Sequence, residues 1–425
     1  MHCRPNFQFK RTGLRARLAC VALSCALAGP ALAETSPWYV GAALGYSHDS
    51  NVFRLPDTLA SMAAPGLSDS ITSATLLGGL DQAIGRQHLY GNATLRDNRF
   101  ANHRALDNTG YGLKLGADWS TVERLSGNFN LMANREMAFL NPDSGVPTLA
   151  HANIARTNQI DGSLRYGLVA RWQLEGSFGR RAMGYSAPEY RSRENREDWA
   201  SVGLRYRPSG ALGLGLAWRQ GQGRFPKFAT LASGDFEADR YRSRNLDLTA
   251  DWIASGASSL NARLSTGRLT HSVAAQRDYS GLTGELRWLW RPTGKLLVTT
   301  TLARETGQEF GAGTSFFVTG TDLSRTVNGL RLLAEHELSG KLKLSAGLSR
   351  SRRALVDTES TILGVPFSVA GADTTNAVTM GLRWTATRST QLSCDYSHER
   401  RSTDGHLSQA YGVNVIGCNG QFTLQ

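Results

Sequence analysis

Apolar and polar side chains alternate in segment after segment between Trp38 and Gln425. In one such segment Tyr111, Leu113 and Leu115 alternate with Gly112 and Lys114. Successive residues of a strand face opposite sides of a sheet, so this period of two predicts β-strands with one apolar face and one polar face.

Eighteen segments follow this pattern, two of them weakly. The sixteen clear ones are Trp38–Tyr46, Tyr111–Trp119, Leu125–Leu131, Ile160–Tyr166, Trp172–Phe178, Val202–Tyr206, Leu212–Trp218, Leu246–Trp252, Leu260–Leu264, Leu282–Trp290, Leu296–Leu302, Leu330–Ala334, Leu342–Leu348, Val378–Trp384, Leu392–Tyr396 and Ile416–Leu424. The two weaker ones are Ser70–Asp81 and His88–Asp97.

The connections separate a membrane barrel from a soluble sandwich, which also alternates. Tight turns alternate with long polar loops along the chain, as short periplasmic turns and long extracellular loops do in outer-membrane barrels. The turns are Ala83–Gln87, Ser120–Arg124, Pro208–Ala211, Ala254–Ser258, Pro292–Lys295, Ser339–Lys341 and Thr385–Thr390. The loops are Leu55–Asp69, Ala138–Asn153, Tyr185–Asn195, Gly221–Ala238, Glu305–Asp322 and Arg352–Asp373. The sequence therefore predicts an all-β protein, an antiparallel transmembrane β-barrel of about eighteen strands.

Four tryptophans each stand just before a tight turn: Trp119, Trp252, Trp290 and Trp384. Their shared position predicts an aromatic girdle at the periplasmic interface, and burial in a core is the alternative. Eighteen strands enclose a lumen wide enough for water unless a segment fills it. Loops such as Arg352–Asp373 have the length to fold inward.

The first 33 residues have the features of a cleaved signal peptide: a basic head, an apolar stretch from Leu18 to Leu27, and the small-residue site Ala31–Ala33. A lipoprotein signal ending at Cys25 is the alternative. Residues 34–425 then form a single barrel domain, and loss of five basic leader residues lowers the formal charge from +12 to +7. An exported protein meets no nucleic acid, so this charge does not indicate a nucleic-acid partner.

Charged residues on the polar faces are candidates for a lumen lining. They are Lys114, Arg165, Arg171, Glu175, Arg205, Arg219, Asp247, Asp251, Arg263, Glu285, Arg287, Glu335, Lys343, Arg383 and Asp395. One interpretation is ordinary solvation of a water-filled wall. The other is a modestly anion-favouring path for a polar, anionic polymer, because guanidinium groups hold carboxylate or phosphate with paired hydrogen bonds.

Two cysteines, Cys394 and Cys418, remain after the leader is removed. Opposed residues of an antiparallel hairpin have a constant index sum, and these two centre on residue 406, inside a polar loop. Both also alternate with apolar residues on the same face. We therefore predict a disulfide between the last two strands, with two unpaired thiols as the alternative.

The segment Tyr46-Ser47-His48-Asp49-Ser50-Asn51-Val52-Phe53-Arg54 ends the first predicted strand. Asp49 and Asn51 share a face, which suits capping of a turn better than a cation site, because two oxygens make a poor calcium site. Together with the terminal Gly417–Gln425, this segment resembles the EpsL-type proteins of exopolysaccharide operons, in the β-barrel porin-2 group. The resemblance implies an outer-membrane protein of exopolysaccharide biosynthesis or export, and brings no catalytic residues with it.

Motifs of the common enzyme classes are missing from the sequence. It contains no Gly-x-Ser-x-Gly, no Gly-Lys-Ser/Thr loop, no His-Glu-x-x-His and no Cys/His metal spacing. We expect no enzyme, metal or cofactor, and a barrel hydrolase using a scattered histidine is the alternative.

Three functions are compatible with such a barrel. The leading one is a channel or scaffold for polysaccharide export, with outer-membrane lipid, the polysaccharide, periplasmic export proteins and the barrel assembly machinery as partners. The others are a general diffusion porin for small solutes and an adhesion or structural barrel that acts through its loops.

Overall fold

The computed structural model describes residues 36–56, 58, 66–138, 151–167, 171–306, 324–360, 366–405 and 407–425. The proposed leader, residues 1–33, lies outside them. Pro37–Gln425 forms one compact unit. None of the helices in these ranges is long and apolar enough to cross a membrane.

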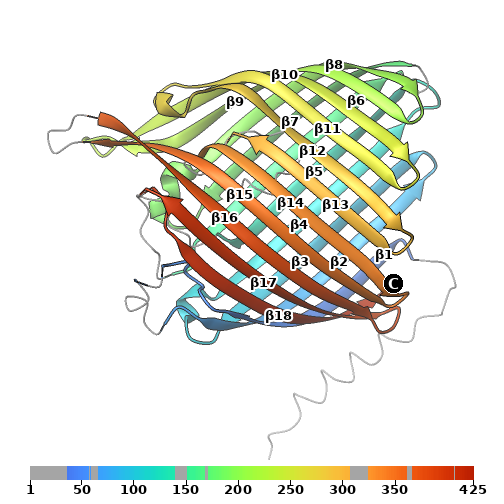
Figure 1. Ribbon diagram of the computed structural model, residues 1–425, viewed down its shortest axis with the longest axis horizontal. Helices are drawn as coiled ribbons and strands as arrows, with labels where there is room; N and C mark the ends of the chain where they lie inside the picture. The colour runs from blue at the N-terminus through green and yellow to red at the C-terminus, as the bar shows by residue number, and fades with distance from the viewer. Residues whose placement is uncertain are drawn as a thin grey trace, which may run out of the picture. The chain divides into compact units, whose positions relative to one another are not determined.

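The described residues of this unit form eighteen strands and three short 3-10 helices (Figure 1). The strands are β1 (Trp38–Asp49), β2 (Asp69–Ile84), β3 (Gln87–Phe100), β4 (Asn108–Ser120), β5 (Leu125–Met137), β6 (Ile154–Tyr166), β7 (Trp172–Tyr185), β8 (Asn195–Ser209), β9 (Leu212–Thr230), β10 (Phe236–Ser255), β11 (Ser258–His271), β12 (Tyr279–Thr293), β13 (Leu296–Glu305), β14 (Ser324–Ser339), β15 (Leu342–Ser360), β16 (Pro366–Thr385), β17 (Thr390–Asp404) and β18 (Tyr411–Leu424). The helices are η2 (Arg104–Leu106), η3 (Pro188–Arg193) and η4 (Ala275–Arg277).

The sheet closes on itself. Each strand pairs antiparallel with its neighbours in sequence, and β1 pairs with both β2 and β18. Val40 lies opposite Leu424 and Asp49 opposite Val415, so ten residues of each strand form this seam. The prediction of an all-β, antiparallel eighteen-strand barrel is confirmed.

The apolar face of each strand points outward and is exposed. Leu44 is 70% exposed, Leu76 61% and Phe178 55%, whereas a soluble sandwich would bury such side chains between its sheets. A closed ladder with an apolar exterior satisfies all backbone groups in lipid and is the architecture of outer-membrane β-barrels.

Aromatic side chains gather on the exterior near the tight turns. Trp252, Trp290 and Trp384 are each more than 40% exposed, and Trp38 and Trp172 are exposed at the same end. The tight turns and the two terminal strand ends all lie at this end of the barrel, which we call the turn end. The opposite end, which carries the longer connections, is the loop end.

Two predicted loops are wrong. The segment Gly221–Ala238 continues β9 to Thr230 and begins β10 at Phe236, and Arg352–Asp373 continues β15 to Ser360 and begins β16 at Pro366. Figure 1 shows the orange β15–β16 hairpin reaching beyond its neighbours. Above the apolar band both faces of a strand meet water, so the hydrophobic period disappears while the backbone ladder continues. The predicted loops Ala138–Asn153 and Glu305–Asp322 lie mostly outside the described residues.

Three loops pack together at the loop end around a small apolar core. Val52 and Phe53 follow β1, Leu106 belongs to η2, and Ala187 and Tyr190 belong to the connection after β7. All five are buried, and the rings of Phe53 and His103 meet edge to face at 4.9 Å. The loops after β1, β3 and β7 thus form one packed structure rather than three independent ones.

Orientation can be tested with cysteines at the two ends. We expect Ser233→Cys, in the connection between β9 and β10, to react with a membrane-impermeant maleimide on intact cells. Gly294→Cys, in the tight turn between β12 and β13, should react only after permeabilisation. Ser233 is preferable to Gly234, whose φ of 86° disfavours a side chain. If only Gly294→Cys were labelled on intact cells, the barrel would have the opposite orientation to the one expected here.

The last two strands are joined covalently. Cys394 and Cys418 occupy directly opposed positions of β17 and β18, with Cα atoms 4.1 Å apart, and form a disulfide. With a sequence separation of 24, the link should stabilise the barrel by about 3 kcal/mol in the chain-entropy model. Non-reducing mass spectrometry of a digest should recover the two peptides linked. Separate peptides, both alkylated without prior reduction, would contradict this.

Candidate functional site

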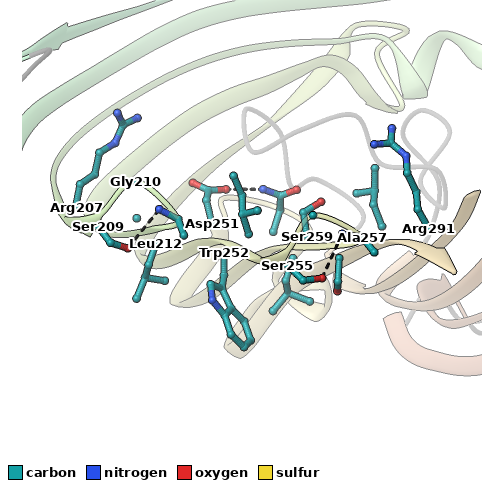
Figure 2. A pocket seen from close by; sticks show the side chains of 18 of the residues that line it. Arg207, Ser209, Gly210, Leu212, Asp251, Trp252, Ser255, Ala257, Ser259 and Arg291 are labelled. Carbon is teal, nitrogen blue, oxygen red and sulfur yellow. Dashed lines mark hydrogen bonds between the residues drawn. The ribbon is translucent and has the colours of Figure 1, made fainter. Parts of the chain in front are cut away.

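The inner wall of the barrel carries the charged candidates. Fourteen of the fifteen lie in strands, at positions that alternate with outward side chains. In Figure 2, Asp251 points to one face of the sheet and its neighbour Trp252 to the other. Arg171 is the exception, because it precedes β7 in the turn that begins after Tyr166.

Four of these candidates form one chain of charges across β6 to β10. Glu175 Oε1 lies 3.4 Å from Arg165 Nε and 3.0 Å from Arg205 Nε. Arg205 Nη1 donates to Asp251 Oδ2 at 2.6 Å, and the amide of Asn261 on β11 donates to Asp251 Oδ1 at 2.6 Å. Opposite charges thus alternate along the wall.

A glycine on β9 makes room for the contact between Arg205 and Asp251, which joins β8 to β10. Arg205 lies on β8 and Asp251 on β10, with Gly213 of β9 directly opposite Asp251. A Cβ atom at Gly213 would lie 3.2 Å from the Arg205 guanidinium. The glycine therefore leaves room for the arginine to cross the intervening strand.

A second, deeper pair lies closer to the loop end. Arg219 donates to both carboxylate oxygens of Asp247, at 2.8 and 3.2 Å, and both residues are buried. Arg263 Nη1 donates to Ser265 Oγ at 2.7 Å, and Arg263 is directly opposite Glu285 in the register of β11 and β12. Ion pairs therefore line the wall from β6 to β10, and on β11 and β12 the register places Arg263 opposite Glu285.

The remaining candidates are more dispersed. Lys343 is opposite Arg383, and its Nζ lies 2.6 Å from Glu337, a residue that sequence reasoning did not select. Within the described part of the chain, no side-chain hydrogen bond or ion pair engages the following candidates: Lys114, Arg171, Arg287, Glu335 and Asp395.

Sequence reasoning missed a polar network on β3, β5 and β6. Tyr90 donates to Asn130, whose amide donates to Asp161 at 3.0 Å. His88 Nε2 lies 2.7 Å from Asp81 and its Nδ1 lies 3.7 Å from Asp118. The signal was present, because these residues share the alternating inward positions. Three additional carboxylates make the wall more balanced in charge than the candidate list suggests.

The turn end of this wall is hollowed. A depression of about 580 Å³ lies between the β8–β9 and β10–β11 turns, and its lining includes Arg205, Arg207, Asp251 and Arg291. Figure 2 shows the Arg207 and Arg291 side chains extending to the same side as Asp251, away from Trp252. The charge chain therefore continues into a basic opening at the turn end.

The segment Tyr46–Arg54 is held in its conformation by hydrogen bonds from its own side chains. The Asp49 carboxylate accepts from Asn51 N at 2.8 Å and from Arg54 Nη1 at 2.9 Å, and the Asn51 amide donates to Leu55 O at 2.7 Å. Arg54 adopts a left-handed φ of 52°. Tyr46 lies directly opposite Cys418, so the two segments that carry the family resemblance pair with each other at the seam.

Two loops are each held by hydrogen bonds to one aspartate carboxylate. Sequence reasoning did not find this arrangement. Asp69, at the start of β2, accepts from the ring and backbone of His103, both at 2.8 Å. Asp239, near the start of β10, accepts from the His271 ring at 2.7 Å and from Val273 N at 2.9 Å. In each case an aspartate of one strand fixes the connection that follows the next strand.

The electrostatics of both aspartates follow from their contacts. Burial alone would raise the pKa of each carboxyl, but the hydrogen bonds from His103, Asn102 and Ser70 lower the pKa of Asp69 below its usual value. Those from His271, Val273 and Ala274 do the same for Asp239. A depressed pKa means that the bonds to the carboxylate stabilise the fold above the ordinary pKa of 3.8 and are lost as the pH falls through the folded value.

No group of three or more histidine, cysteine or acidic side chains among the described residues is arranged to hold a metal ion. The paired charges of the wall are suited to contact with a hydrated polar solute.

Comparison with known proteins identifies similar barrels only. No family model and no curated protein match the chain. Among solved structures, OpdK of Pseudomonas aeruginosa is 12% identical over 91% of this chain and 99% of its own, with a TM-score of 0.45. OprD of the same organism is 12% identical over 91% and 95%, with a TM-score of 0.46. OccK2 (OpdF) is 14% identical over 91% and 97%, with a TM-score of 0.48. These identities are far too low for a shared ligand to follow.

The hydrogen bonds by which Asp239 holds the loop after β11 can be tested by proteolysis. Asp239→Asn removes the charge that holds Ser272–Ala274, at a cost of about 1 to 3 kcal/mol for hydrogen bonds to a buried carboxylate. We expect trypsin to cleave after the buried Arg277 at least about tenfold faster. Asp235→Asn, in the neighbouring exposed turn, is the control and should leave the rate unchanged. Equal cleavage in the wild type and Asp239→Asn would show that the carboxylate does not hold the loop.

Proposed function

We propose that the protein is an outer-membrane channel whose mixed-charge inner wall conducts small polar solutes, with the turn end in the periplasm and the loop end outside the cell. The chain from Arg165 through Glu175 and Arg205 to Asp251 carries this proposal. It places charges of both signs along the wall where the barrel encloses its lumen.

The pairing of charges determines the expected selectivity. A wall of unpaired arginines would concentrate anions, because fixed charge acts within a Debye length of about 10 Å at 0.1 M salt. Here the inner-wall arginines Arg165, Arg205 and Arg219 each contact a carboxylate. Three further carboxylates of the wall, Asp81, Asp118 and Asp161, add negative charge. We therefore propose a smaller anion preference than the arginine content alone indicates.

Removing one arginine tests this arrangement. Arg205→Gln leaves Glu175 and Asp251 without their shared cation, so the reversal potential in a planar bilayer under a salt gradient should shift toward cation preference. Arg350→Gln removes the same charge from an exposed outward position of β15 and is the matched control.

Three results would count against the channel. These are no conductance from the folded wild-type protein, an unchanged reversal potential in Arg205→Gln, or an equal shift in Arg350→Gln. A gel-mobility shift on heating establishes that each variant is folded.

A second candidate function is exopolysaccharide export. It is supported by the resemblance carried by Tyr46–Arg54 and Gly417–Gln425, which lie side by side at the seam. In this case the polymer and periplasmic export proteins are the partners, and the polymer passes along the inner wall that carries the arginines. A strain lacking the protein would then stop secreting polymer, and Arg205→Gln would restore solute uptake but not secretion. Normal secretion in the deletion strain would exclude this role.

A further inference from the structure

Six arginines form a patch on the outward face of the barrel at the loop end. The outer arginine patch consists of Arg196 on β8, Arg224 on β9, Arg240, Arg242 and Arg244 on β10, and Arg268 on β11. Each is separated by an even number of residues from an exposed apolar side chain of its own strand, such as Trp218, Leu246 or Leu264. The six therefore share the face of the sheet that carries the apolar band.

The register brings like charges directly together. Arg224 is opposite both Arg196 and Arg240, so three arginines form one row across three strands. Two residues from Arg242, Arg244 is opposite Arg268 on β11. Directly opposed strand positions have Cβ atoms about 5 Å apart, and like charges there are destabilising. A bound multivalent anion would remove this repulsion.

The patch has little internal compensation. All six side chains are exposed, and none forms an ion pair or side-chain hydrogen bond with another described residue. The inner wall differs, since Arg205 and Arg219 on the same strands each contact a carboxylate. The neighbouring acid on the outer face, Asp198, is paired with Arg180 through short contacts.

The patch adjoins the membrane-facing surface. Arg244 is two residues from Leu246 on the same face, a distance of about 7 Å along the strand. At the other end of β10 the outward position carries Trp252, and β12, adjacent to β11, carries Trp290 at the same end. A hollow of about 670 Å³ is lined by the four arginines Arg196, Arg224, Arg240 and Arg242 and by one acid, Asp198, which is paired with Arg180. It has room for a phosphate group and part of a sugar.

We propose that this patch binds the phosphate groups of bisphosphorylated glycolipid, of the lipid A type, in the outer leaflet around the barrel. Guanidinium groups bind phosphate with paired, charge-assisted hydrogen bonds, and acyl chains below would contact the apolar band. The proposal rests on the orientation given under the proposed function, with the loop end outside the cell. It concerns the exterior wall and is independent of what passes through the lumen.

Lipid binding to the full-length barrel in dodecyl maltoside tests the proposal. The patch variant combines Arg196→Gln, Arg224→Gln, Arg240→Gln and Arg244→Gln. The control combines Arg86→Gln, Arg124→Gln, Lys341→Gln and Arg388→Gln, four exposed positions in tight turns at the turn end, and removes the same charge. By native mass spectrometry, bisphosphorylated lipid A should bind the patch variant at least about tenfold more weakly than wild type and the control equally well. Dephosphorylated lipid A should bind all three proteins weakly.

Three outcomes would overturn the proposal: undiminished lipid A binding by the patch variant, an equal loss in the control, or equally tight binding of phosphatidylglycerol by the wild type. Heat-dependent gel mobility establishes folding in each case. Bilayer conductance measured on the same preparations separates this proposal from the channel. Conductance with undiminished lipid binding refutes only the patch, whereas phosphate-dependent binding without conductance refutes only the channel.

Discussion

Closure of the backbone ladder is the constraint on which the rest of the structure depends. In lipid an unpaired N–H or C=O group costs several kcal/mol, so no strand of this protein can remain an edge. The pairing of β1 with β18 removes the two edges that a linear chain would otherwise leave. Once the ladder is closed, each side chain has only two directions available, and the alternation of the sequence distributes lipid contact and water contact between them.

The two faces use the same residue type differently. Inside, Arg205 and Arg219 contact carboxylates on neighbouring strands, because a partly buried charge is costly without a partner. Outside and above the apolar band, Arg224 and Arg240 are exposed and directly opposed, which water tolerates but does not favour. Arginine is thus a structural partner on one face and an available ligand on the other. Composition alone does not separate these roles.

The alternation was sufficient to predict the strand number, the tight turns and the opposed positions of Cys394 and Cys418. It failed where Gly221–Ala238 and Arg352–Asp373 rise above the membrane, because hydrophobicity no longer marks the pleat there. The contacts of Asp69 with His103 and of Asp239 with His271 were also beyond prediction. They join residues more than thirty positions apart through loop geometry that no local pattern records. The distances between charged groups along the inner wall could not be predicted either, because they depend on side-chain conformations and on the space left by Gly213.

The seam between the first and last strands has a consequence for assembly. It joins residues separated by nearly the whole length of the barrel, as Val40 and Leu424 show, so it carries the greatest loop-closure entropy of any strand pair. Pairs of consecutive strands can form locally, but this contact requires both ends of the sheet to be present and curved toward each other. Until then β1 and β18 are unsatisfied templates able to recruit a strand from another chain. The period before closure is therefore when the nascent sheet is most exposed to misassembly.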